Sequence, residues 1–94
     1  MTPKTQGQQI REAIAGDYPG LLVLEPEYFD DAIIGLASRC GLDAICYDKE
    51  KVIELLCVKE GMTYEDAVEH FEFNIAGSYV GETTPIFLDR TYHE

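Results

Sequence analysis

The sequence predicts an α+β domain in which helices pack on one face of a small, mostly antiparallel sheet of three or four strands. Apolar residues recur at helical spacing in three segments, and two strand-like segments flank a short turn that contains Gly41. Hydrophobic residues make up 46% of the 94 residues, which is enough for one core and argues against disorder. We therefore expect a single domain over residues 1–94, with frayed ends at 1–4 and 89–94.

The first expected element is a helix over residues 5–15. Thr5 and Gln8 are spaced as in a capping box, which satisfies backbone N–H groups at a helix start. Gly7 weakens the pattern, because glycine is a poor residue for a helix interior. The residues expected on the buried face of this helix are Ile10, Ala13 and Ile14.

Residues 27–39 fit two periodicities at once. Their apolar side chains recur at helical spacing and also alternate as in a strand, and for so short a run the pattern does not separate the two. Gly35 would weaken the centre of a helix by about 1 kcal/mol. We therefore expect a strand over 31–38 that forms a hairpin with residues 43–47. The apolar run 21–24 fits either a strand or a packed loop.

Two helices and a last strand are expected in the second half of the chain. Asp48 is placed to cap a helix over 49–60, which Gly61 ends. Thr63 caps the next helix, and a short strand follows over 86–88, so the expected order is α-β-β-α-α-β. The residues expected on the inward face of the helix after Thr63 are Tyr64, Ala67, Val68, Phe71, Ile75 and Tyr79.

The charge and the cysteines restrict the classes of partner. The chain has 18 acidic against 7 basic residues and a formal net charge of −11. Such a surface repels nucleic acid and anionic membranes and attracts basic protein surfaces. No apolar run reaches the roughly 20 residues that span a bilayer. Three cysteines (Cys40, Cys46 and Cys57) and the lack of an N-terminal secretion signal predict free thiols in the cytoplasm.

The helix after Thr63 carries a stripe of acidic residues. Glu65, Glu69 and Glu72 are spaced four and three residues apart, so they share one helix face. No Lys or Arg occurs between Glu60 and Asp89 to neutralise them. The stripe is either a solvated face or a docking surface for a basic protein. The predicted partner-binding residues are Glu65, Asp66, Glu69, Glu72, Tyr79 and Glu82.

Two further residues of this helix are candidates for chemistry. Asn74, the only asparagine of the chain, is expected to be buried, where an amide needs a hydrogen-bond partner. Its side chain would tie the helix to the loop 81–85, or would contact a ligand in a shallow pocket with Tyr79 and Thr84. His70 could act as the base of a cysteine nucleophile, but no nucleophile motif surrounds the cysteines. No metal-binding motif is present, and neither a metal nor another cofactor is expected.

The same region resembles a pattern found in short uncharacterised proteins of bacteria and bacteriophages. The resemblance covers roughly the last two thirds of the chain and implies a small cytoplasmic protein with no assigned reaction. Phage genomes carry many small acidic proteins that block host machinery by occupying nucleic-acid sites. The residues that carry the resemblance are Glu65, Asp66, Ala67, Glu69, Phe71, Asn74, Gly77, Tyr79, Gly81, Glu82, Thr84 and Pro85.

These observations lead to three hypotheses about function. The first is a non-enzymatic interaction protein that inhibits a host protein by occupying its basic, nucleic-acid-binding surface, without binding nucleic acid or membrane itself. The second is a small-ligand-binding module, and the third is an enzyme that uses His70 with a cysteine. A helix face and a sheet edge also make a homodimer compatible with the sequence.

Overall fold

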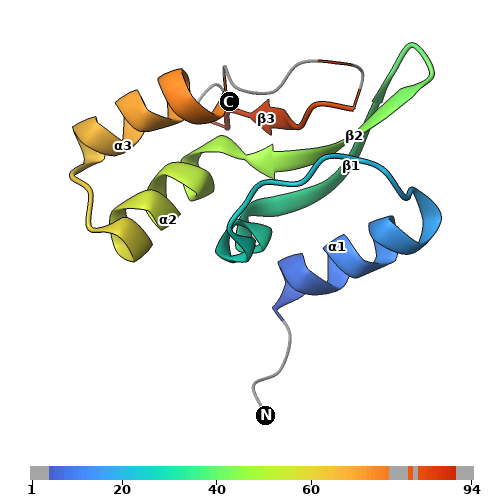
Figure 1. Ribbon diagram of the computed structural model, residues 1–94, viewed down its shortest axis with the longest axis horizontal. Coiled ribbons are helices and arrows are strands. Elements are labelled where there is room, and N and C mark those ends of the chain that lie inside the picture. The colour runs from blue at the N-terminus through green and yellow to red at the C-terminus, as the bar shows by residue number, and fades with distance from the viewer. Residues whose placement is uncertain (1–4, 77–80, 82, 91–94) are drawn as a thin grey trace.

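The computed structural model in Figure 1 describes residues 5–76, 81 and 83–90 of the chain. The α+β class and the predicted order α-β-β-α-α-β are confirmed. Across these described residues, no helix has the length and apolar character that crossing a membrane requires. The elements in chain order are α1 (Gln6–Asp17), the 3-10 helix η1 (Glu27–Ala32), β1 (Ile33–Arg39), β2 (Leu42–Asp48), α2 (Lys49–Glu60), α3 (Tyr64–His70), the π-helix η2 (Phe71–Ile75) and β3 (Ile86–Leu88).

The three strands form one mixed sheet in the order β1-β2-β3. The predicted hairpin is present, with β1 antiparallel to β2 and Leu36 opposite Ile45. The last strand instead runs parallel to β2, with Cys46 opposite Ile86. Parallel neighbours need a long crossover, and here α2 and α3 supply it. β3 therefore lies beside β2 although the whole helical pair separates them in sequence (Figure 1).

Local capping signals set the helix starts as the sequence predicts. Thr5 and Gln8 form a complete capping box at α1. The Asp48 carboxylate accepts a hydrogen bond from the Lys51 N–H, at 3.3 Å, and so caps α2. Gly61 then ends α2 in the left-handed conformation, with φ of 70°. These groups act within a few residues of one another, so a single sequence is enough to reveal them.

The ambiguous segment 27–39 divides between the two expected structures. Its first part is the helix η1, in which Phe29 and Ala32 are buried three residues apart, and only its second part is strand. The predicted strand start at Asp31 is therefore two residues early. The run 21–24 is a packed loop, in which the Leu24 N–H donates to the buried Tyr47 hydroxyl at 2.9 Å.

Helix α1 packs against β1 and η1, and its backbone approaches that of η1 closely at Gly7. A Cβ atom at this position would lie 1.8 Å from the Asp30 carbonyl oxygen. Next to this contact, Arg11 Nη1 pairs with Asp30 Oδ2 at 3.1 Å. Gly7, which weakens the helix pattern in the sequence, is thus what allows the helix to dock.

The core lies between α2, α3 and the sheet, and Tyr47, Ile45, Ile53, Leu56 and Val52 are its largest fully buried side chains. Ala67, Phe71 and Ile75 are buried on the inward face of α3 and η2, and Val68 is half-buried, as predicted. The expected burial of Tyr64 is wrong, because this first residue of α3 is 59% exposed. The expected burial of Ala13 is also wrong: α1 buries only Gly7 and Ile14.

Candidate functional site

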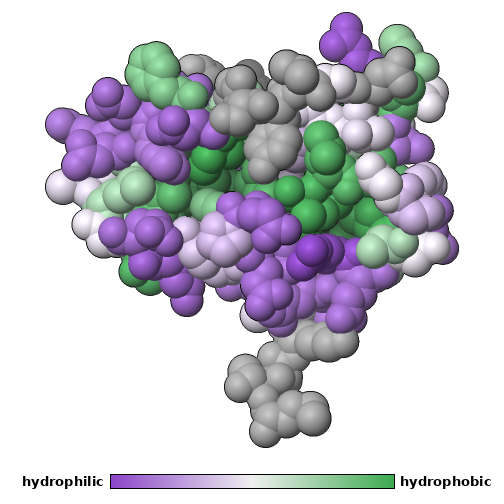
Figure 2. Space-filling model, viewed as in Figure 1, coloured by the Kyte–Doolittle hydropathy of each residue, from purple (hydrophilic) through white to green (hydrophobic). Residues whose placement is uncertain are grey.

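The acidic residues of α3 and of the start of η2 are held on an exposed helical face. Thr63 caps this helix by accepting a hydrogen bond from the Asp66 N–H at 3.2 Å. The anchoring residues Ala67 and Phe71 point into the core, so the opposite side of the helix faces solvent. Figure 2 shows hydrophilic residues gathered over α3 and α2 at the left of this view. Glu65, Asp66, Glu69 and Glu72 are all exposed, and together they are called the acidic face below.

Among the described residues, the acidic face forms no ion pair with a basic side chain. The basic side chains that might have neutralised it pair with other carboxylates. Arg11 pairs with Asp30, Lys49 with Asp89 at 3.7 Å, and Arg90 with Asp48 at 3.6 Å. In the described part of the chain, no ion pair joins a Lys or Arg to the acidic face. Its negative potential is therefore open to an outside partner.

A shallow hollow of about 510 Å³ lies along one side of the acidic face. Asp66 and Glu69 line it, but Glu65 and Glu72 do not. Phe73 also lines it and is 75% exposed, which is unusual for so large an apolar side chain. The residues lining this α3 hollow are Met62, Asp66, Glu69, His70, Phe73 and Asn74. It therefore combines carboxylates with an exposed aromatic ring.

The π-helix η2 continues directly from α3 and carries Glu72, the last residue of the acidic face. The Ala76 N–H donates to the Phe71 carbonyl at 2.7 Å, which closes a turn one residue wider than an α-helical turn. Phe71 and Ile75, four residues apart, are both buried, while Phe73 between them faces solvent. We find no signal in the sequence for this wide turn beyond the presence of Asn74 within it.

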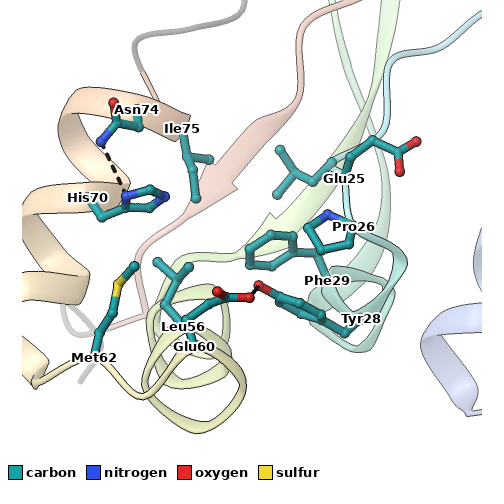
Figure 3. Close-up of a pocket in the computed structure, with 11 residues that line it drawn as sticks. Glu25, Pro26, Tyr28, Phe29, Leu56, Glu60, Met62, His70, Asn74 and Ile75 are labelled. Carbon is teal, nitrogen blue, oxygen red and sulfur yellow. Dashed lines mark hydrogen bonds between the residues drawn. The ribbon is translucent and has the colours of Figure 1, made fainter.

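A second hollow, of about 460 Å³, adjoins the first and shares Met62, His70 and Asn74 with it. It lies between η2 on one side and the loop and 3-10 helix around Pro26 on the other, with the end of α2 at its base (Figure 3). Leu24, Phe29, Leu56 and Ile75 give it buried apolar walls. Glu25 and Glu60 add carboxylates, and no Lys or Arg is among its described lining residues. We call this cavity the Tyr28 pocket.

One hydrogen bond fixes the carboxylate of the Tyr28 pocket. The Tyr28 hydroxyl donates to Glu60 Oε2 at 2.7 Å, which joins η1 to the last residue of α2 (Figure 3). Burial, together with the hydrogen bond and the negative charge of Glu60, raises the pKa of Tyr28 to about 12. The hydroxyl is therefore a donor at every physiological pH. The Tyr28 and Phe29 rings lie 4.6 Å apart, with a tilt of 50°.

Asn74 differs from its predicted environment. It is exposed rather than buried, and its Nδ2 lies 3.2 Å from Nδ1 of His70, one helical turn earlier. The spacing of four residues is the one at which helix side chains meet, so this pair is readable from the sequence. Both residues line the two hollows, whereas Thr84 lines neither, and the expected ligand contact of Asn74 stays a prediction.

The remaining predicted site residues contribute less. Tyr79 and Glu82 lie outside the described residues. Cys40 is exposed, Cys46 and Cys57 are half-buried, and all three are free thiols. Burial raises the pKa of Cys46, which disfavours the reactive thiolate. Within the described part of the chain, no hydrogen bond joins His70 to a cysteine, and no group of three potential ligands is placed to hold a metal ion.

Comparison of the chain with protein-family models, with curated proteins and with solved structures finds no match. The resemblance to short bacterial and bacteriophage proteins therefore stays a prediction. Support for a function therefore comes from the exposure and charge of the acidic face and from the shape of the two hollows.

Proposed function

We propose that this chain is a non-enzymatic interaction protein that binds a basic surface of another protein through the acidic face and the α3 hollow. The observation that carries the proposal is a set of four exposed carboxylates that form no ion pair with a basic side chain in the described structure, beside an exposed phenylalanine. Charge would attract and orient the partner, and Phe73 would supply apolar contact area at the centre of the interface.

The class of partner follows from the same chemistry. Surfaces that hold nucleic acid are rich in Lys and Arg, because these residues bind the phosphates. We therefore propose that the protein acts as an inhibitor that competes with nucleic acid for such a surface. The proposed location is the cytoplasm, where the three free thiols are stable.

Binding to a synthetic peptide rich in arginine, lysine and leucine tests the first step. In the test variant, Glu65, Glu69 and Glu72 are changed to Lys. In the matched control, Asp17, Glu50 and Glu54 are changed to Lys. These three residues lie on α1 and α2, outside both hollows. Each reversal adds two charges, so both variants change the formal net charge from −11 to −5. Glu50 lies in the first turn of α2 as Glu65 does in α3, so the helix-dipole effect is matched at this pair, whereas Asp17 is the last residue of α1 and Glu54 pairs with Lys51 at 3.3 Å.

We expect the Kd of the test variant to rise at least about tenfold at low salt, because three rim attractions of a few tenths to 1 kcal/mol each become repulsions. The control should change several-fold less. Raising the ionic strength should weaken the wild type steeply, since exposed charges are screened within about 8 to 10 Å. Equal losses in the two variants would show that only net charge matters, and would refute the assigned surface.

The inhibitor step needs the natural partner. Affinity capture from a bacterial lysate at low salt, followed by mass spectrometry, would supply candidates. A captured nucleic-acid-binding protein should then lose its nucleic acid when the wild-type chain is added, but not when the test variant is added. A partner whose nucleic-acid binding is unaffected would rule out inhibition by occupation.

A further inference from the structure

The Tyr28 pocket lies directly beside the proposed docking surface and differs from it in shape. The α3 hollow is shallow and ringed by exposed charges, whereas the Tyr28 pocket has buried apolar walls from Leu24, Leu56 and Ile75. Met62, His70 and Asn74 line both, so a segment bound along α3 passes the mouth of the pocket. A side chain projecting from that segment can enter it.

The lining selects the chemistry of this side chain. Glu60 is held in place by the Tyr28 hydroxyl through one of its oxygens. Its other oxygen, Oε1, accepts no hydrogen bond from a described residue. Glu25 also lines the cavity, but its carboxylate points away from Glu60 (Figure 3), and no described Lys or Arg lines the cavity. Glu60 is an exposed residue, so its carboxylate repels an anionic side chain and attracts a cationic donor, while water can still reach it.

We propose that the Tyr28 pocket receives an arginine side chain of the basic partner. The guanidinium donates to Glu60 and lies against the Tyr28 ring, while the aliphatic stem contacts Leu56 and Ile75. This assignment rests on the proposed function, because the arginine comes from the segment that α3 binds. It adds a specific anchor to an interface that charge alone would leave unselective.

Arginine fits this lining better than lysine does. The guanidinium is planar, stacks on aromatic rings and presents several N–H groups to a carboxylate, whereas an ammonium is a compact and strongly hydrated charge. The fixed Glu60 carboxylate and the adjacent Tyr28 and Phe29 rings offer both kinds of contact at one place.

A titration with blocked arginine tests this assignment without any partner. The probe is N-acetyl-arginine amide, followed by NMR of the 15N-labelled chain at physiological ionic strength. The matched ligand is the citrulline analogue, which has almost the same shape and no charge. We expect arginine to bind at least about fivefold more tightly than citrulline, with the largest shifts at Tyr28, Glu60 and Met62. Equal binding of citrulline, or of the lysine analogue, would overturn the assignment.

Protein variants locate the recognition. Glu60→Gln keeps an acceptor for Tyr28 but removes the charge, and should weaken arginine binding about five- to tenfold. Tyr28→Phe releases Glu60 and should cost about two- to threefold. Asp17→Asn removes the same unit charge at the end of α1 and should change nothing. An unchanged affinity in Glu60→Gln would overturn the assignment, and the spectrum of each variant shows whether it is folded.

The triple reversal of Glu65, Glu69 and Glu72 separates this inference from the proposed function. None of the three lines the Tyr28 pocket, so blocked arginine should bind the triple variant within about twofold of the wild type. Loss of arginine binding in that variant, with Glu60→Gln unaffected, would place the recognition on the acidic face and refute the pocket. Failure of the proposed function would appear instead as peptide binding that survives the reversal.

Discussion

Replacing Gly7 with alanine tests how α1 is attached to the rest of the fold. In an ordinary helix interior this change stabilises by about 1 kcal/mol, because alanine is the better helix former. Here the new methyl group would lie 1.8 Å from the Asp30 carbonyl oxygen and 3.0 Å from the Asp31 Cα. Both atoms belong to backbone, so no side chain can rotate away and α1 itself has to move.

The cost follows from these distances. Overpacking in a tight contact costs about 1 to 3 kcal/mol, and an overlap of this size places Gly7→Ala at or above the upper end. Moving α1 also separates Arg11 from Asp30, which is 3% exposed and whose Oδ1 already has no hydrogen-bond partner among the described residues. After subtracting the gain in helix propensity, we expect a net loss of about 2 kcal/mol or more.

Gly16 supplies the matched control within the same helix. A Cβ atom there meets nothing within 4 Å, so Gly16→Ala should stabilise by up to about 1 kcal/mol. Urea titration gives the free energy of unfolding of both variants, which are fitted with one common dependence on urea concentration. Gly7→Ala should lower the free energy of unfolding, whereas Gly16→Ala should raise it. If both variants were stabilised equally, α1 would not be docked at Gly7 and the reasoning would be refuted.

Three other predictions follow from single contacts. Burial raises the pKa of Asp30 above its ordinary 3.8 despite Arg11, so the folded state holds the proton more tightly than the unfolded state. The stability of the wild type relative to Asp30→Asn should therefore rise as pH falls from neutrality toward 3.8. A decrease in this relative stability over the same pH range would contradict the raised pKa. Tyr47→Phe leaves the buried Leu24 N–H without its acceptor and should cost about 1 to 3 kcal/mol in urea unfolding, where an unchanged value would exclude that bond. Phe71→Ala should cost about 3 to 5 kcal/mol, whereas Phe73→Ala should leave stability within about 0.5 kcal/mol and weaken binding of the basic peptide. A large loss of stability in Phe73→Ala would show that this ring is packed rather than presented.

The features readable from the sequence are those that short-range chemistry determines. Thr5, Asp48 and Thr63 cap helices through atoms three residues away, and their roles are confirmed. Gly61 ends a helix because it adopts a left-handed conformation that other residues avoid. The position of the acidic face follows from helix periodicity in the same way.

The features that the sequence does not reveal depend on contacts between distant segments. Tyr28 and Glu60 are 32 positions apart, and no local pattern indicates that they bond. The parallel placement of β3 depends on how the helical crossover packs, which periodicity does not encode. Gly7 has an unfavourable local propensity that a tertiary contact overrides, and the helical pattern does not indicate the wide turn of η2.

The central claim is that a basic partner binds at residues 62–76 rather than anywhere on an acidic surface. Mapping of backbone amide shifts in the 15N-labelled chain, on addition of the arginine-, lysine- and leucine-rich peptide, tests it most directly. We predict that the largest changes cluster around Asp66, Glu69 and Phe73 and saturate with one peptide per chain. Small changes spread evenly over α1, α2 and α3, or a cluster centred on α1, would contradict the account.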